Sequence, residues 1–323
     1  MDLLETEVAL KKLKDYFERA LTYELHLTRV SAPLFVQPET GLNDNLNGVE
    51  EPVSFTVKDG DTFVEIVHSL AKWKRNALKR YNFSIGEGLY TDMNAIRKDE
   101  ELDNLHSIYV DQWDWEKIIA KADRTEEKLK EIVRSIFRVF KSTESYITFE
   151  YKQLDGPYLP EEITFITTQE LEDMYPDLTP KEREDRIARE KKAVFIQKIG
   201  GRLKSGIKHD GRAPDYDDWE LNGDIVFYYP LFDSAFEMSS MGIRVDEDSL
   251  KLQLGIEGCS ERLKMDFHKD LMEGKLPYTV GGGIGQSRIC MYFLQKAHIG
   301  EVQSSIWPSS MIQECEKEGI ILL

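Results

Sequence analysis

The stretch GGGIGQSR, from Gly281 to Arg288, places four glycines and one arginine at the end of an apolar, strand-like segment. Residues without a side chain allow a flat base or ribose to lie on the backbone, and an arginine can hold a phosphate with its rigid fork of donors. The segment RICMYFLQ that follows has the composition of a helix. The alternative is a glycine-rich turn that packs a strand against a helix.

The glycine spacing excludes two common nucleotide motifs. A Rossmann fingerprint needs a glycine at its sixth position, where this sequence has Gln286 or Arg288, and a phosphate loop needs a Gly-Lys pair that is absent here. The pattern that fits is GxGxGxxR, formed by Gly281, Gly283, Gly285 and Arg288.

The order of apolar patterns around this stretch predicts an α+β fold. Helical spacing covers residues 4–21 and 125–140, and Thr179, Pro180 and Glu182 form a capping signal for a further helix. Strand-like segments are VSAPLFVQ, the hairpin around Asp59-Gly60, and four later apolar runs. Since helices do not alternate regularly with strands and no low-complexity linker divides the chain, we expect one catalytic domain over residues 1–323 and no doubly wound sheet.

Composition limits the partners and the compartment. The 323 residues carry a formal net charge of -17, which disfavours broad contact with nucleic acid. No signal peptide or membrane-length apolar run is recognisable, and the three cysteines are scattered without metal-ligand spacing. These features predict a cytoplasmic protein that acts on small molecules, without nucleic-acid or membrane partners.

The GxGxGxxR pattern resembles motif 3 of the class II aminoacyl-tRNA synthetases. The first helix and the strand with Pro33 resemble their motif 1, and Arg97 with the strand after it resembles motif 2. Further segments are similar to those of the ammonia-dependent asparagine synthetases, or aspartate–ammonia ligases: HSLAKWKR, GEGLYTDMNAIR, YVDQWDWE, RAPDYDDW, LNGDI and FEMSSMGIRVD. The resemblance extends from the first helix to the last residues.

This resemblance implies a class II synthetase-like core, a mostly antiparallel β-sheet flanked by helices, and a homodimer. It implies an ATP-dependent ligase that makes L-asparagine from L-aspartate and ammonia through a β-aspartyl adenylate, with release of AMP and pyrophosphate. By the same resemblance Arg97 should contact the α-phosphate and Arg288 the γ end of ATP, while Gly283 and Gly285 should lie against the nucleotide.

Magnesium should bridge phosphate oxygens through Asp224 and Glu237. These acids lie on two strand-like segments joined by the turn-prone PLFDS, so a hairpin would bring them to one face. Counting by twos places Glu237 with Ser239 and Met241. A carboxylate among apolar neighbours is costly unless it is paired or metal-bound, and a buried salt bridge is the alternative to magnesium.

Aspartate has three charged groups to recognise. Lys74 is expected to bind its side-chain carboxylate, whereas Lys72 and Arg75 should serve solvent or phosphate. In YVDQWDWE, alternation puts Gln112 and Asp114 opposite the tryptophans, as the floor of a polar pocket. The remaining candidates for aspartate are Asp44, Arg212, Asp217, Ser239, Ser240 and Arg244.

These candidates are expected to bind different parts of aspartate, and one of them has an alternative structural role. Asp44 and Asp114 would bind the α-ammonium, although Asp44 with Gly48 nearby also suits an Asx turn. Arg244 would hold the α-carboxylate, and Arg212 and Asp217 lie in a loop that would close over the substrate. Only Glu220 separates Trp219 from Leu221, so a lid built from a longer family insert is in doubt.

The second step leaves one role open. Ammonium must lose a proton before it attacks, and Asp44, Asp114 and Asp217 are equivalent candidates for this transfer. Glutamine is not the expected donor, because Asp2 follows Met1 and no N-terminal cysteine is present. A tRNA synthetase and a non-catalytic sensor of aspartate or AMP are the competing functions.

Overall fold

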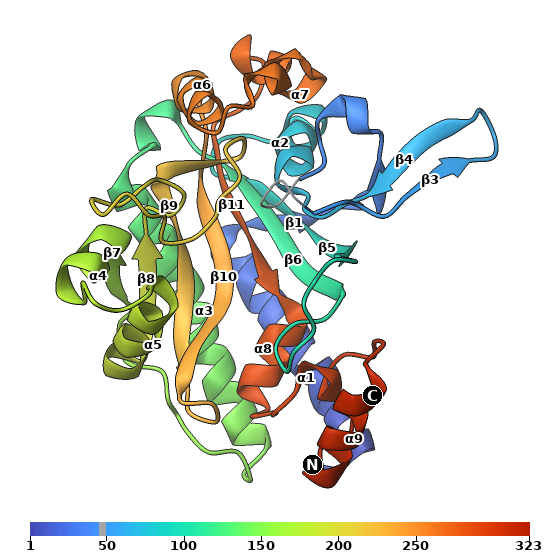
Figure 1. Cartoon of the computed structure of the whole chain (residues 1–323), viewed down its shortest axis with the longest axis vertical. Helices are drawn as coiled ribbons and strands as arrows, with labels where there is room; N and C mark the ends of the chain where they lie inside the picture. The colour runs from blue at the N-terminus through green and yellow to red at the C-terminus, as the bar shows by residue number, and fades with distance from the viewer. Residues whose placement is uncertain (45–49) are drawn as a thin grey trace.

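The computed structural model describes residues 1–44 and 50–323. Its central element is an eight-stranded sheet with the order β1-β5-β6-β11-β10-β9-β8-β7 (Figure 1). The strands are β1 (Leu27–Arg29), β5 (Gly88–Ile96), β6 (Tyr109–Ile118), β7 (Thr164–Thr167), β8 (Ala193–Gln197), β9 (Asp217–Tyr229), β10 (Ser234–Arg244) and β11 (Thr279–Gly285). The edge pairs β1–β5 and β7–β8 are parallel, and the other neighbours are antiparallel.

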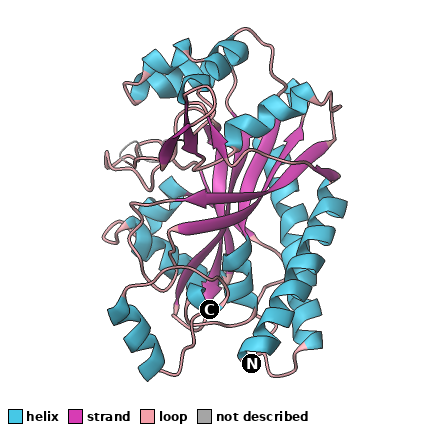
Figure 2. Cartoon of the chain, turned by 90° about the vertical axis from the view of Figure 1, so that its right-hand side faces the viewer, coloured by secondary structure: helices cyan, strands magenta, loops and turns pink. Residues whose placement is uncertain are grey.

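One face of the sheet is covered by the helices α1 (Leu3–Leu25), α3 (Glu126–Glu150) and α8 (Gln286–Phe293), whose apolar residues join the main core. Figure 2 shows the helix that starts at the N-terminus running beside the strands. Phe17 of α1 stacks on Trp113 of β6 and packs against Phe140 of α3. The predicted helices at 4–21 and 125–140 are therefore confirmed; α1 extends beyond both predicted limits, and α3 extends beyond the C-terminal one.

The remaining helices are distributed over the opposite face, the ends and the edges of the sheet. They are α2 (Ala71–Arg80), α4 (Thr168–Met174), α5 (Pro180–Lys191), α6 (Glu247–Ile256), α7 (Asp266–Met272) and α9 (Ser309–Lys317), with short 3-10 turns η1 (Pro38–Thr40), η2 (Lys121–Asp123), η3 (Ser260–Lys264) and η4 (Ile299–Glu301). Thr179 caps α5 in a capping box with Glu182, as the sequence predicts. No described helix is long and apolar enough to cross a membrane.

A small second sheet projects from the body. It has the order β2-β4-β3, with β2 (Phe35–Val36), β3 (Ser54–Val57) and β4 (Thr62–Ile66), and the hairpin predicted around Asp59-Gly60 joins β3 to β4. The predicted strand VSAPLFVQ is mostly wrong, because only Phe35–Val36 pair there. The strand that enters the main sheet is Leu27–Arg29, directly after α1.

Candidate active site

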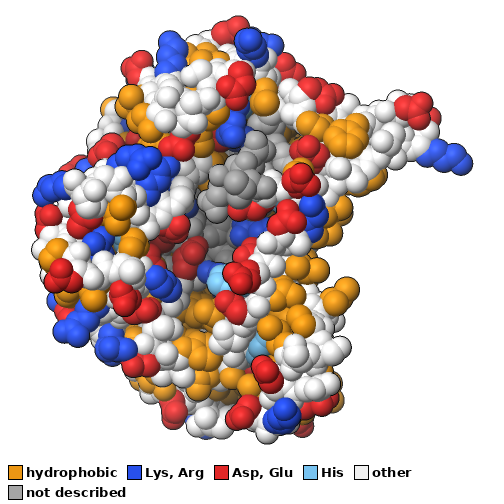
Figure 3. Space-filling model, viewed as in Figure 1, with side chains coloured by type: hydrophobic (Ala, Val, Ile, Leu, Met, Phe, Trp, Pro, Cys, Tyr) orange, Lys and Arg blue, Asp and Glu red, His pale blue; other side chains and the backbone are white. Residues whose placement is uncertain are grey.

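The two faces of β6 separate the hydrophobic core from a polar cavity of about 410 Å³. Trp113 and Trp115 are buried in the main core, whereas Gln112 and Asp114 line the cavity. This alternation confirms the predicted polar floor. Figure 3 shows a hollow in this face of the molecule with basic and acidic side chains around it.

Nearly all of the predicted site residues meet in this cavity, although they come from distant parts of the chain. Those that line it are Asp44, Arg97, Gln112, Asp114, Arg212, Asp217, Asp224, Glu237, Ser239, Ser240, Arg244, Gly283, Gly285 and Arg288. Gly48, the other member of the possible Asx turn at Asp44, lies outside the described residues.

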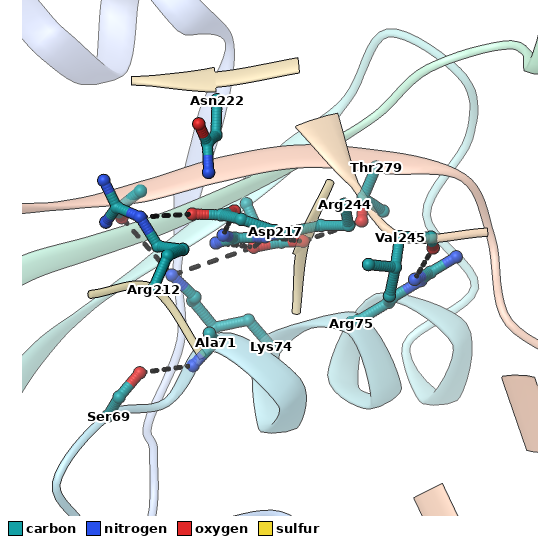
Figure 4. Close-up of polar contacts among 12 residues, drawn as sticks. Ser69, Ala71, Lys74, Arg75, Arg212, Asp217, Asn222, Arg244, Val245 and Thr279 are labelled. Atoms are coloured by element: carbon teal, nitrogen blue, oxygen red, sulfur yellow. Dashed lines mark hydrogen bonds and ion pairs between the residues drawn. The ribbon is translucent and has the colours of Figure 1, made fainter. Parts of the chain in front are cut away.

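Lys74 is the exception, because it lies beneath the floor of the cavity (Figure 4). Its side chain is fully buried, and its ammonium group pairs with Asp114 and donates to the carbonyl oxygens of Trp115 at 2.9 Å and Gly282 at 3.3 Å. Burial lowers the pKa of Lys74, and the charges of Asp114 and Glu116 oppose this shift. Lys74 is therefore the counter-charge of Asp114 and not a residue of the cavity wall, and its contact with a substrate carboxylate stays a prediction.

The neighbours of Lys74 also differ from expectation. The side chain of Lys72 is buried against Asp215 at 3.0 Å, and Arg75 donates to the carbonyl oxygens of Pro277 at 2.8 Å and Val245 at 2.7 Å. Burial lowers the pKa of Arg75 to about 10. Neither cation serves solvent or phosphate, because α2 packs this face against β6 and β11 rather than exposing it.

Glu116, which lies behind the cavity wall and holds Arg244, is a supporting residue that the sequence analysis missed. It is fully buried and accepts hydrogen bonds from Nε and Nη2 of Arg244 at 2.8 to 3.0 Å and from Thr279 at 2.7 Å. Arg244 uses its remaining Nη1 for Asp217 (Figure 4). The signal was available, because Glu116 continues the period of two begun by Gln112 and Asp114.

The glycines of β11 make room for these side chains. A Cβ placed on Gly281 would lie 2.7 Å from Nη2 of Arg244 and would clash with the carboxylate of Glu116. A Cβ on Gly283 would clash with the amide of Gln112. Gly281 and Gly283 must therefore lack a side chain, because Arg244, Glu116 and Gln112 of the protein itself occupy the space that a Cβ would fill.

The predicted metal acids lie on neighbouring strands. A register shift between Glu237 and Ser239 reverses the predicted alternation, so Ser240 lies opposite Asp224 and donates to Glu237 at 3.0 Å. The grouping of Glu237 with Ser239 is therefore wrong; the hydroxyl of Ser239 instead donates to the carbonyl of Gly283.

Each acid already has a cation beside it. Asp224 pairs with Arg212, and Glu237 lies 3.5 Å from Arg288. Burial raises the pKa of Asp224 to about 7, with Glu237 adding to the rise and Arg212 opposing it. Burial also acts to raise the pKa of Glu237, but Arg288 and the hydroxyl of Ser240 bring it below its ordinary value.

The donor set fits magnesium that is shared with a nucleotide. Among residues 1–44 and 50–323, no group of three or more His, Cys, Asp or Glu side chains forms a metal cage. Magnesium commonly uses one or two protein carboxylates and takes its other ligands from phosphates and water. Asp224 and Glu237 supply such a pair, and a divalent cation would offset their mutual repulsion.

Arg97 and Arg288 approach the cavity from two sides, and each side chain keeps more than a quarter of its surface exposed. The amide of Arg97 donates to the carbonyl of Ile108 at 2.8 Å, which closes the base of the loop between β5 and β6. Arg288 stands in the first turn of α8, directly after the glycine strand. The geometry thus offers two accessible guanidinium groups and a carboxylate pair to one polyanionic ligand.

Comparison with known proteins gives one consistent result. Residues 4–319 match the sequence profile of a family described as aspartate-ammonia ligase. An aspartate–ammonia ligase of Ruminiclostridium cellulolyticum is 71% identical, covering 100% of this chain and 96% of the relative. One of Clostridium tetani is 69% identical, covering 100% and 95%.

Among solved structures, the asparaginyl-tRNA synthetase of Pyrococcus horikoshii complexed with asparaginyl-adenylate superposes with a TM-score of 0.68 at 14% identity. The match covers 94% of this chain and 70% of that one. This likeness shows that the fold is that of a class II aminoacyl-tRNA synthetase core, as the sequence predicts. With the family profile spanning almost the whole sequence, the chain belongs to the aspartate–ammonia ligase family.

Proposed function

We propose that this chain makes L-asparagine from L-aspartate, ammonia and ATP through a β-aspartyl adenylate, releasing AMP and pyrophosphate. The observation that carries the proposal is the meeting of two partly exposed arginines, a carboxylate pair and the Gln112–Asp114–Arg244 surface in one cavity. High identity to aspartate–ammonia ligases over the full chain supports it.

In the first step, a side-chain carboxylate oxygen of aspartate attacks the α-phosphorus, and the bond from that phosphorus to the pyrophosphate oxygen breaks. Two anions must approach each other, so cations must offset their repulsion. Arg97 would bind the α-phosphate and Arg288 the leaving end, while magnesium held by Asp224 and Glu237 would neutralise phosphate charge.

The polar floor would orient aspartate. Arg244 would hold the α-carboxylate, which would displace or share its contact with Asp217, and Ser239 or Ser240 would assist. Asp114, fixed by Lys74, and Asp44 would receive the α-ammonium. Arg212 and Asp217 would close the pocket from the β9 side.

In the second step, ammonia attacks the β-carbonyl carbon of the adenylate, and AMP leaves with the C–O bonding electrons. Ammonium must first give up a proton to a carboxylate of the pocket. Asp44, Asp114 and Asp217 can be separated by their Asn variants. The acceptor's variant should lose much more of asparagine formation than of aspartate-dependent exchange of pyrophosphate into ATP, whereas the variant of a residue that only binds aspartate should lose both equally.

We further propose a homodimeric, cytoplasmic enzyme with one catalytic domain over residues 1–323. The uninterrupted eight-stranded sheet supports the single domain. Sedimentation would test the dimer, since monomers at all accessible concentrations would contradict it.

The decisive experiment is product analysis with aspartate, magnesium ATP and ammonium, without glutamine or tRNA. Asparagine and AMP should appear in equal amounts. ADP with phosphate would indicate an acyl-phosphate route, and a requirement for added tRNA would indicate a synthetase. Binding of aspartate or AMP without turnover would indicate a sensor.

A further inference from the structure

We propose that Asp215 and His268 are positioning residues of the aspartate pocket, acting through a buried ionic cluster outside the cavity. The cluster consists of Lys72, Asp215, Arg262 and His268, none of which lines the cavity. The inference rests on the proposed function, since it assigns these residues to the binding of aspartate.

The contacts converge on one carboxylate oxygen. Oδ2 of Asp215 lies 3.0 Å from Nζ of Lys72, 3.3 Å from Nη1 of Arg262 and 3.0 Å from Nε2 of His268. The side chains of Asp215 and His268 are fully buried. Burial alone would raise the pKa of Asp215, but Lys72, His268 and Arg262 hold it far below its usual range. The carboxylate is therefore charged and acts as the centre of the cluster.

Three segments that supply pocket residues meet at this centre. Lys72 lies on α2, two positions before Lys74. Asp215 lies between Arg212 and Asp217 in the loop that enters β9.

The third segment is reached through His268 of α7. A Cβ on Gly41 would lie 3.2 Å from its Nδ1, so the ring packs directly on the backbone three residues before Asp44. The cluster therefore connects α2, the Arg212–Asp217 loop and the segment that carries Asp44. Displacement of the loop or of the Asp44 segment would move a group that is aimed at aspartate, and displacement of α2 would move Lys74, which fixes Asp114 in the cavity floor.

Stability alone is a poor reason for such a cluster. Removing charges from water is costly, and well-packed apolar residues often stabilise a core as much as a buried ion pair does. Oδ1 of Asp215 and Nδ1 of His268 also lack hydrogen-bond partners within the described part of the chain. The ion pairs instead fix the positions of the three segments relative to one another. This matters because a shift of about 1 Å at a reacting group can lower the rate by about 100-fold.

The test compares His268→Leu with His268→Gln. Leucine removes the donor to Asp215 at similar volume, whereas the glutamine amide can place a donor near the position of Nε2. In His268→Leu, the KM for aspartate should rise about tenfold and the KM for ATP should stay within about twofold, because only the aspartate pocket loses alignment. His268→Gln should restore the KM for aspartate to within about threefold of the unaltered enzyme.

Lys72→Met is the second variant, and it keeps the His268 and Arg262 contacts to Asp215. It should also raise the KM for aspartate selectively. An unchanged KM for aspartate in His268→Leu and Lys72→Met, with activity falling only in proportion to folded protein, would overturn the inference. If the unaltered enzyme makes no asparagine, the proposed function fails instead, so the two failures are distinguishable.

Discussion

Glu116 accepts hydrogen bonds from Nε and Nη2 of Arg244 at 2.8 to 3.0 Å. Because the guanidinium is planar, this buried contact also fixes the direction of its remaining nitrogen, Nη1. That nitrogen pairs with Asp217 at the cavity wall. The contact with Glu116 therefore holds the Arg244 side chain in an orientation suited to binding the carboxylate of a substrate.

Glu116→Gln should separate aspartate binding from ATP binding. The substitution keeps the size of the side chain but removes the buried charge opposite Arg244, which is left with Asp217 as its remaining charge partner. The free energy of unfolding should fall by about 3 kcal/mol, as expected when one member of a buried ion pair is removed. Denaturant unfolding and initial-rate kinetics would show a raised KM for aspartate; an equal rise in the KM for ATP would mean that the pair supports the whole site.

Gly281→Ala should disable the pocket through a single methyl group. The new Cβ would press on Glu116 and on Nη2 of Arg244, and neither buried group has space to withdraw. Gly255→Ala is the matched control, because nothing lies within 4 Å of a Cβ at that helical position. We expect aspartate-dependent pyrophosphate exchange to be lost only in Gly281→Ala; normal exchange would show that the β11 backbone adjusts.

Arg288→Ala should abolish adenylation without unfolding the protein. The side chain is partly exposed; it donates to the carbonyl of Glu237 at 3.2 Å and to its carboxylate at 3.5 Å, and it lies 6.0 Å from the centre of the Phe236 ring. Loss of one preorganised cation at the developing charge should lower kcat for pyrophosphate exchange by about 100-fold or more. The melting temperature serves as control, and exchange at the original rate would refute the assignment of the glycine motif to ATP.

Asp224 should give the metal-free protein a pH-dependent stability. Its pKa is about 7 in the folded chain, whereas an unfolded aspartate titrates near 3.9. The folded state thus binds more protons between these values, so this residue's contribution to stability falls as pH rises from about 4 to 7. Without magnesium, the melting temperature of Asp224→Asn should exceed that of the unaltered protein at pH 7.5 but not at pH 4.5. A difference independent of pH would contradict the shift.

Magnesium binding should show the opposite trend with pH. The metal requires the ionised carboxylate, so its affinity in the presence of a non-hydrolysable ATP analogue should increase as pH rises through about 7. Calorimetry with Asp224→Asn is the control, because that variant should bind weakly at every pH. Equal affinity in both proteins would remove Asp224 from the metal site.

Local patterns in the sequence determined much of this protein. The glycine spacing marked β11, the alternation of Gln112 and Asp114 with two tryptophans separated a polar floor from the core, and Thr179 with Glu182 fixed a helix start. Such signals depend on side-chain period and capping within a few residues, which a single segment contains.

The tertiary structure decided what local patterns cannot contain. The bulge after Glu237 reversed the alternation of β10, and Lys74 found Asp114, Trp115 and Gly282 as partners instead of an open pocket. The pairing of Asp215 with Lys72 and His268 depends on how distant segments pack. A buried charge needs a counter-charge, and only the folded chain determines which one lies near it. The sequence by itself thus identified the family's chemistry and predicted most of the polar residues that line the cavity. Only the fold determined which charged side chains face the cavity and which lie behind them as buried partners.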